Sequence, residues 1–355
     1  MDNIKNLLNE NIDFLETTIL VSGKSGSGKS TLIKTVFKNL IEETPEDRVG
    51  LPVTEQTKVY SALGGKLKII DTIGYTLSDN YKKIKSDSKR TINKQNVDIM
   101  WYVINSSGNR IEEDEINFIN SISDTIPVII VISQTVGTNS IRLAEEIKKM
   151  NLKSVAILNI LARDFYLLEN NVIKAFGIDL LLENTIKELS IKKQETFISA
   201  QEYNLDLKVK LARRWSKTYI GATFGVGFAP IPYSDAPILV PLQVTMFLHI
   251  AKIFGISQNK DKLTALLSSF IMPETAKLIG RSVSSNLLKF IPGAGIIISG
   301  LINGTTAASV TYLLVEAYIK SLKIYLKNGN TNIDDGFIKT FKDNILKLKK
   351  GKNDE

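Results

Sequence analysis

The chain has 355 residues, 43% of them hydrophobic and 23% charged, which is enough apolar sequence for two folded domains. It has no cysteine and a single histidine, His249, so disulfide frameworks, thiolate metal sites and zinc sites built on several histidines are excluded. The basic excess lies wholly in the second half, where residues 191–355 carry 22 Lys+Arg against 12 Asp+Glu. The first residues carry an acid before any apolar run, unlike a signal peptide, so we expect a cytoplasmic location.

Residues 23–30, Gly-Lys-Ser-Gly-Ser-Gly-Lys-Ser, match the phosphate-binding pattern G-x-x-x-x-G-K-[ST] at every fixed position. The β-branched run 17–21 predicts a strand before this loop, and the apolar spacing of 31–37 predicts a helix after it. Such a loop aims backbone N–H groups and a helix N-terminus at an anion. We expect Lys29 to reach the β- and γ-phosphates and the Ser30 hydroxyl to bind Mg²⁺. The expected nucleotide-binding residues of this loop are Gly23, Ser25, Gly26, Ser27, Gly28, Lys29, Ser30 and Thr31.

Two further strand-like runs, 58–63 and 66–70, flank Gly64-Gly65 and predict a hairpin. The second run ends in Asp71-Thr72-Ile73-Gly74, a D-x-x-G motif. A carboxylate at the tip of a strand can hold Mg²⁺ through water, and a glycine N–H can approach the γ-phosphate without a side chain in the way. Asp71 is therefore an expected metal and nucleotide residue, and Gly74 an expected catalytic one.

The segment 50–57, between these motifs, is expected to cover the phosphates. A threonine in such a segment closes on Mg²⁺ and the γ-phosphate in the triphosphate state. Thr54 is the favoured candidate for this metal and catalytic role. Thr57 is the alternative, although it adjoins the next strand.

The remaining first half alternates apolar strands with polar helical segments. Strands are predicted at 99–104, 128–132 and 155–158, and helices near 111–123, 139–150 and 177–189. Alternation of this kind predicts an α/β fold with a mostly parallel sheet, here of six strands, and helices on both faces. We assign residues 1–190 to this domain.

The loop, Asp71 and Gly74 resemble the Era-like branch of small P-loop GTPases over roughly residues 15–190. The resemblance implies a GTPase that binds GTP and GDP with Mg²⁺. Ras-type enzymes carry a water-orienting Gln after D-x-x-G, whereas this chain has Tyr75. Slow intrinsic hydrolysis is therefore expected, with help from a potassium ion, an activating protein or a homodimer formed through the GTPase domain.

The base-reading motif of such GTPases, [NT]-K-x-D, is absent after the strand ending at Ile132, where Ser133-Gln134-Thr135-Val136 stands instead. The S-A-[KL] motif is represented only by Leu161-Ala162-Arg163. Base contacts are expected from Gln134 and from the backbone around Ala162. Guanine is favoured by the resemblance, and an adenine nucleotide remains the alternative.

From about residue 190 the strand signal stops and long apolar helical stretches predict an all-α domain, 191–340, followed by a basic tail, 341–355. The strings Pro230-Ile231-Pro232-Tyr233 and Ile291-Pro292-Gly293-Ala294-Gly295 resemble the helical, YcjF-like domain of unknown function that many bacterial GTPases carry. Three interpretations stay open for 200–325: a compact bundle, association with an anionic inner-membrane surface or membrane protein, and a true membrane span within 290–315.

Nucleic-acid binding is disfavoured, because the basic residues are not interleaved with aromatics and no RNA-binding motif appears. Two functional hypotheses follow. The first is a hydrolysing switch whose nucleotide state is passed to the helical half. The second is a nucleotide-binding scaffold that hydrolyses little and works by membrane or protein association.

Overall fold

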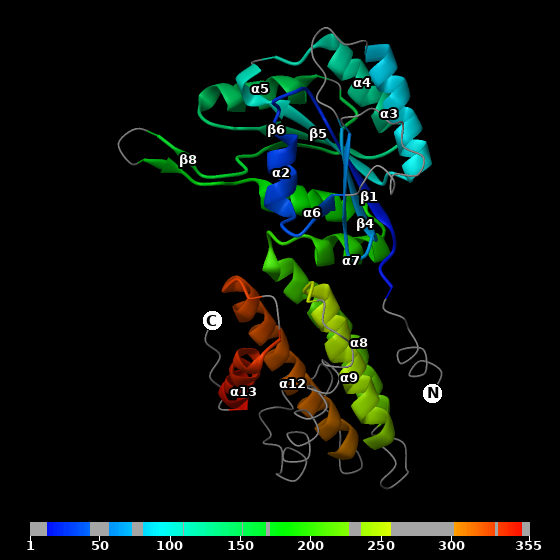
Figure 1. Cartoon of the computed structure of the whole chain (residues 1–355), viewed down its shortest axis with the longest axis vertical. Coiled ribbons are helices and arrows are strands. Elements are labelled where there is room, and N and C mark those ends of the chain that lie inside the picture. Colours follow the sequence, from blue (N-terminus) through cyan, green and yellow to red (C-terminus); the bar gives the residue numbers. More distant parts are fainter. Residues whose placement is uncertain are drawn as a thin grey trace. The chain divides into compact units, whose positions relative to one another are not determined.

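The computed structural model describes residues 13–42, 57–72, 81–108, 110–150, 152–167, 171–226, 236–256, 302–330 and 333–349 (Figure 1). The chain forms two compact units, one spanning Phe14–Asn204 and a second that contains the chain from Leu205 onward. Each unit has its own core and is described by itself.

The first unit is built on one sheet of seven strands. The strands are β1 (Thr17–Ser22), β2 (Ile41–Glu42), β3 (Lys58–Ala62), β4 (Leu67–Asp71), β5 (Ile99–Asn105), β6 (Val128–Ser133) and β7 (Ala156–Asn159). Their order is β2-β3-β4-β1-β5-β6-β7; the pairs β2–β3 and β3–β4 are antiparallel and the others parallel. The expected α/β fold is confirmed, and the strand beyond the expected six is the two-residue edge strand β2.

Helices cover both faces of this sheet. Successive side chains of a strand point to opposite faces, and the central strands are apolar on both. On β5, Met100 and Tyr102 join a buried cluster with residues of α3, α4 and α5. Trp101 points the other way, and its ring stacks 6.2 Å from that of Phe37. The helices of this unit are α2 (Lys29–Val36), α3 (Tyr81–Gln95), the 3₁₀ turn η2 (Ser106–Gly108), α4 (Glu113–Ser123), α5 (Thr138–Lys149), α6 (Ile178–Glu188) and α7 (Ile191–Ala200).

Helix α7 belongs to the first unit, although the strand signal ends before it. Phe197 is fully buried, and its ring lies edge-on to Trp101 with the centroids 6.3 Å apart. Thr196 Oγ1 donates a 2.7 Å hydrogen bond to the backbone carbonyl two residues before β1. The units therefore divide after Asn204 in the structure, whereas the change in sequence pattern places the division after residue 190.

Two hairpins interrupt the alternation of strands and helices. The first joins β3 to β4 at Gly64 and Gly65, whose φ angles of 66° and 84° suit glycine, so the predicted turn is confirmed. The second, which the sequence pattern does not indicate, pairs β8 (Phe165–Tyr166) with β9 (Val172–Ile173) in a separate antiparallel ribbon. Figure 1 shows this ribbon projecting from the carboxyl end of β7.

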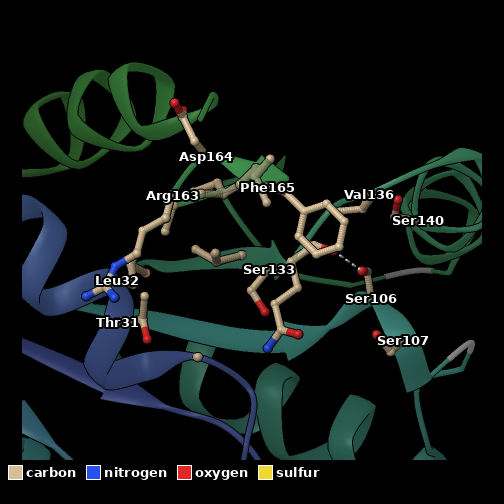
Figure 2. A pocket seen from close by; sticks show the side chains of 16 residues that line it. Thr31, Leu32, Ser106, Ser107, Ser133, Val136, Ser140, Arg163, Asp164 and Phe165 are labelled. Carbon is tan, nitrogen blue, oxygen red and sulfur yellow. Dashed lines mark hydrogen bonds between the residues drawn. The ribbon is translucent and has the colours of Figure 1, made fainter. Parts of the chain in front are cut away.

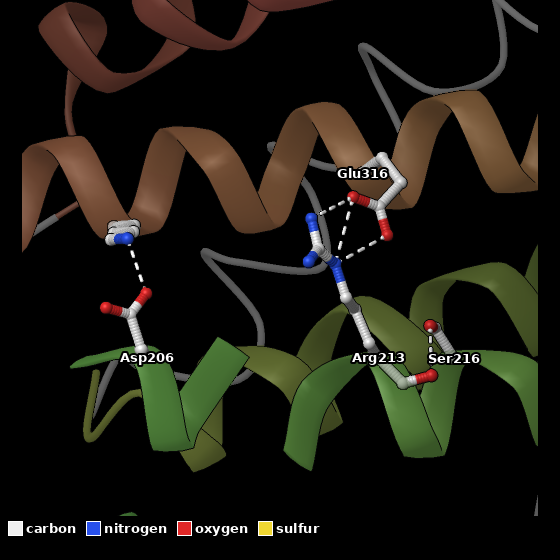
Figure 3. Close-up of polar contacts among 5 residues, drawn as sticks. Asp206, Arg213, Ser216 and Glu316 are labelled. Carbon is white, nitrogen blue, oxygen red and sulfur yellow. Dashed lines mark hydrogen bonds and ion pairs between the residues drawn. The ribbon is translucent and has the colours of Figure 1, made fainter. Parts of the chain in front are cut away.

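The second unit contains four helices in its described part: α8 (Leu205–Val226), α9 (Ala236–Ile253), α12 (Ile302–Lys327) and α13 (Asp335–Lys349). Tyr318 of α12 is fully buried, with ring contacts to Phe247 of α9 at 4.6 Å and to Phe341 of α13 at 5.6 Å. Arg213 of α8 and Glu316 of α12 form a bidentate ion pair (Figure 3). The expected basic tail begins inside α13, where Phe341 packs in the core.

Several expectations fall on residues outside the described ranges: Thr54 within 50–57, and the pair Gly74-Tyr75. The two proline-containing strings of the second half, near 230–233 and 291–295, lie outside them as well. None of the helices in the described part of the chain has the length and apolar composition needed to cross a bilayer.

Candidate functional site

The glycine-rich loop between β1 and α2 has the backbone that its sequence requires. Gly23, Gly26 and Gly28 have φ angles of 144°, 73° and 92°. At Gly23 a Cβ atom would lie 2.2 Å from the carbonyl oxygen of Val103, so no other residue fits there without moving β5. Gly28 is the N-cap of α2, which places the positive end of that helix at the loop.

Lys29 lies across the inside of this loop. Its side chain is buried, and its Nζ donates 3.0 Å hydrogen bonds to the carbonyl oxygens of both Gly23 and Lys24. Burial lowers the pKa of the Lys29 ammonium, and the nearby Asp71 carboxylate opposes that shift. The loop therefore curls around a buried amine, which is the arrangement that binds phosphate oxygens.

Ser30 and Asp71 meet at the ends of two different elements. Ser30 Oγ, at the start of α2, donates a 2.7 Å hydrogen bond to Asp71 Oδ2 at the end of β4. Asp71 is only 5% exposed, and its Oδ1 is buried without a hydrogen-bond partner among the described residues. Burial raises the pKa of Asp71, against the opposing effects of Ser30 and Lys29.

These oxygens fit the Mg²⁺ ion that the motif implies. Mg²⁺ takes oxygen ligands and binds proteins through one or two side chains, with the rest of its shell from water and phosphate. The hydroxyl of Ser30 and the unpartnered oxygen of Asp71 supply this donor set. Among the described residues there is no cluster of three or more His, Cys, Asp or Glu side chains that would favour another metal.

A cavity of about 550 Å³ opens beside the loop, at the carboxyl ends of β6 and β7 (Figure 2). Four expected nucleotide residues line it: Gly28, Thr31, Gln134 and Ala162. The other expected residues that the structure describes lie on the loop or on β4, on the side of Lys29. The structure thus brings the predicted phosphate residues and the predicted base residues to one edge of the sheet, where ligands of such folds bind.

The segment that replaces the base-reading motif is tied to the loop. Ser133 Oγ donates a hydrogen bond to the carbonyl oxygen of Ser27 and also lies 3.2 Å from the carbonyl oxygen of Ile104. Gln134 has a φ of 53°, and its Nε2 donates a 3.3 Å hydrogen bond to the carbonyl of Gly26. Ser133 and Gln134 therefore hold the loop in place, and Gln134 can still turn its amide toward a bound base.

A buried polar network anchors the loop from the other side, and no sequence motif marks it. Lys24 Nζ lies 2.7 Å from Glu115 Oε2 and 3.4 Å from Glu112 Oε2 at the start of α4. Tyr102 Oη donates a 3.0 Å hydrogen bond to the other oxygen of Glu115. Only the position of Lys24 inside the loop motif could have drawn attention to it.

The wall of the cavity is completed after β7 by Arg163, Asp164 and Phe165. Arg163 belongs to the segment expected to supply base contacts, whereas Asp164 and Phe165 were not expected. The Asp164 carboxylate accepts hydrogen bonds from Lys174 Nζ at 2.8 Å and from the backbone N–H of Ala175 at 2.9 Å. The bond from Lys174 is the main reason that the pKa of Asp164 is lowered. In Figure 2, Asp164 points away from the cavity and the ring of Phe165 points into it.

The first unit is similar to known proteins. Residues 18–134 match the family described as "50S ribosome-binding GTPase". Septin-9 of Mus musculus and Septin-9 of Homo sapiens are each 28% identical over 150 residues, covering 34% of this chain and 25% of the relative. The chain thus spans about a quarter of the length of these curated relatives.

Solved structures with similar folds include a probable GTP-binding protein engB, at 18% identity and a TM-score of 0.34, covering 48% of this chain and 98% of that one. The G domain of the T. maritima FeoB iron transporter has 16% identity and a TM-score of 0.33, with coverages of 49% and 98%. Aquifex aeolicus Era has 17% identity and a TM-score of 0.28, with coverages of 48% and 65%. Together with the loop geometry, the family match over residues 18–134 shows that the first unit has the P-loop GTPase fold.

Proposed function

We propose that this chain is a Mg²⁺-dependent, GTP-hydrolysing switch protein of the bacterial Era-like kind. The observation that carries the proposal is the Ser30–Asp71 pair directly beside the Lys29 loop, in which one buried carboxylate oxygen has no partner within the described part of the chain. Without a metal or a phosphate this arrangement is a costly way to end β4, because a buried carboxylate oxygen lacks a partner. A bound Mg²⁺ ion with its nucleotide would supply the missing partner of that oxygen.

The roles of the residues follow from their chemistry. Lys29 would exchange its bonds to the Gly23 and Lys24 carbonyls for phosphate oxygens, and the N–H groups at the start of α2 would bind the same phosphates. Ser30 and Asp71 would hold Mg²⁺, which supplies positive charge next to the β- and γ-phosphates. Thr54 and Gly74 keep the catalytic roles expected from their positions in the sequence.

Hydrolysis by the isolated chain is proposed to be slow. A tyrosine cannot orient an attacking water as the Gln of Ras-type enzymes does, and this chain has Tyr75 at that position. Acceleration would then come from outside the monomer, through a potassium ion, an activating protein or a second copy of the GTPase domain.

The helical unit is proposed to be the output of the switch, as a YcjF-like domain that contacts a protein partner or the inner face of the bacterial membrane. Its excess of basic residues supports an anionic partner, since residues 205–355 hold 20 Lys+Arg against 10 Asp+Glu. Flotation of the full chain with anionic vesicles, in the GDP and GTP states, tests the membrane alternative. Protein that stays at the bottom of the gradient in both states removes it.

The test of the enzyme is phosphate release from Mg²⁺·GTP by the wild-type chain and by Lys29→Ala. The matched control is Lys34→Ala, which removes an exposed lysine from the same helix. We expect slow release from the wild type and Lys34→Ala and at least a tenfold loss in Lys29→Ala. Equal phosphate release from all three proteins contradicts the proposed GTPase activity. Binding of GTP without release above background supports the nucleotide-binding scaffold, and tighter binding of ATP than of GTP overturns the guanine assignment.

A further inference from the structure

The walls of the cavity beside the loop offer few free groups for reading the edge of a base. Three serine hydroxyls on this wall already donate to backbone carbonyls: Ser133 to Ser27, Ser106 to Gln134 and Ser140 to Gly137. Asp164 is the one carboxylate among the described residues that line the cavity, and Lys174 together with the N–H of Ala175 engages it. The described part of this wall therefore presents no free carboxylate to accept a hydrogen bond from the 2-amino group of guanine.

An aromatic face is presented instead. Phe165 lines the cavity and is 44% exposed, so its ring is accessible to a ligand there. Figure 2 shows its ring beside Val136, near Ser106 of η2 and Ser133 at the end of β6. A flat apolar ring at the mouth of a cavity of this kind suits a flat aromatic ligand.

The ribbon that carries this ring is fixed at its base. Leu161 and Phe176 exchange backbone hydrogen bonds of 3.1 and 3.0 Å, which close the neck of the ribbon immediately after β7. The ion pair of Asp164 with Lys174 crosses the ribbon next to Phe165. Phe165 is therefore held over the cavity before any ligand enters, which lowers the entropic cost of stacking.

We propose that Phe165 is a base-stacking residue, and that this site holds the purine base by stacking on that ring without a carboxylate that reads the 2-amino group. The inference rests on the proposed function and deepens it. Stacking accepts any purine face, so a guanine base and a hypoxanthine base, which lacks only the 2-amino group, bind equally well here.

Tyr166 provides a matched control. It is the next residue on β8, it is aromatic, and it is 73% exposed. Successive residues of a strand point to opposite faces, and Tyr166 is not among the described residues that line the cavity. Removing its ring tests the general tolerance of the ribbon without touching the base site.

The experiment measures the affinities of the full chain for GDP, IDP and pyrophosphate with Mg²⁺, in the wild type and in Phe165→Ala, Phe165→Trp and Tyr166→Ala. We expect Phe165→Ala to weaken GDP and IDP by the same factor, about 5- to 100-fold, and to leave pyrophosphate unchanged. Phe165→Trp should retain nucleotide affinity, and Tyr166→Ala should match the wild type. The wild type should bind GDP and IDP within about threefold of each other.

Other outcomes overturn the inference. Unchanged GDP affinity in Phe165→Ala, or an equal loss in Tyr166→Ala, removes Phe165 from the base site. A preference of tenfold or more for GDP over IDP shows that a group outside this wall reads the 2-amino group. A wild-type chain that binds neither GDP nor pyrophosphate overturns the proposed function itself, whereas binding of GDP that is insensitive to Phe165 overturns the inference alone.

Discussion

Ser30 and Asp71 lie 41 positions apart and are joined by a 2.7 Å hydrogen bond, while the buried Asp71 Oδ1 has no partner in the ranges that the structure describes. The carboxylate is placed to bind a cation, and its burial destabilises the fold when no cation is bound. Its pKa is raised by burial, so the folded state binds a proton more readily than the unfolded state. The sign follows directly: ionisation of Asp71 destabilises the fold at neutral pH, and this loss of stability is relieved as the pH falls through the raised pKa.

Asp71→Asn should therefore separate stability from function. Asparagine can still accept the hydrogen bond from Ser30, and it removes the buried charge. We expect the free energy of unfolding at pH 7 without metal to rise by about 1 kcal/mol and to depend less on pH below neutral. The Mg²⁺-dependent part of GDP affinity should be lost. Thermal unfolding and nucleotide titration, each with and without Mg²⁺, check both results. A less stable variant that keeps its response to Mg²⁺ contradicts this assignment of Asp71.

Two glycines of the loop should respond differently to the same added methyl group. A Cβ at Gly23 would lie 2.2 Å from a backbone oxygen of β5, whereas one at Gly26 meets nothing within 4 Å. Gly23→Ala should cost at least about 3 kcal/mol of stability or prevent folding, because backbone must move. Gly26→Ala should cost about 1 kcal/mol, the strain of a left-handed φ alone. Urea unfolding measures both, and similar losses in the two variants would contradict the packing of Gly23 against β5.

Lys24 and Glu115 are coupled across the first unit. Glu115 is 2% exposed, and its carboxylate is satisfied by Lys24, Tyr102 and the backbone N–H of Glu112. Lys24→Met leaves a buried carboxylate without its cation and should cost about 2 kcal/mol.

A double-mutant cycle tests this coupling. Glu115→Gln in the Lys24→Met background removes the unpaired charge and should recover about half of the loss. The free energies of unfolding of the wild type, both single variants and the double variant give the coupling energy. Additive effects of the two substitutions would show that Lys24 and Glu115 do not act as a pair.

The phosphate-binding side of the site could be predicted from the sequence because it is encoded locally. The residues 23–30 lie in one continuous motif, and Asp71 ends a strand whose apolar run is plain. The turn at Gly64-Gly65 and the strands β5 and β6 were predicted for the same reason. The parallel order of the strands follows from the helices between them.

Gln134 and Ala162 were named from the sequence and line the cavity, but the wall formed by Asp164 and Phe165 could not be predicted, because it depends on contacts between distant or very short elements. The strands β8 and β9 have two residues each, too few for any periodicity to appear. Tertiary packing determines that Asp164 pairs with Lys174 and that Phe165 faces the cavity. Helix α7 belongs to the first unit and not, as expected, to the helical unit. The reason is again a contact between distant residues, because Phe197 packs against Trp101.

In the helical unit, His249 makes a buried contact whose energy depends on pH. Its Nδ1 lies 3.3 Å from Tyr219 Oη, and its ring centroid lies 4.4 Å from that of Trp215. Burial, with a smaller effect from Lys252, lowers the pKa of His249 to about 3. The folded state therefore keeps this histidine neutral, while the unfolded chain takes up a proton near pH 6.5. Stability is complete above about pH 6.5 and is lost as the pH falls toward about 3, by about 2–3 kcal/mol at about pH 4.5.

His249→Gln should remove this dependence, because glutamine keeps a polar group near Tyr219 and does not titrate. The chain has two tryptophans, Trp101 in the first unit and Trp215 in the second, so Trp101→Phe leaves a fluorescence signal that reports the helical unit. In that background, urea unfolding at about pH 7 and about pH 4.5 should show a loss of stability about 2–3 kcal/mol larger in the protein that keeps His249 than in the His249→Gln variant. If both proteins lose the same stability on acidification, the histidine is protonated in the folded unit, and carboxylates elsewhere in the helices govern its response to pH.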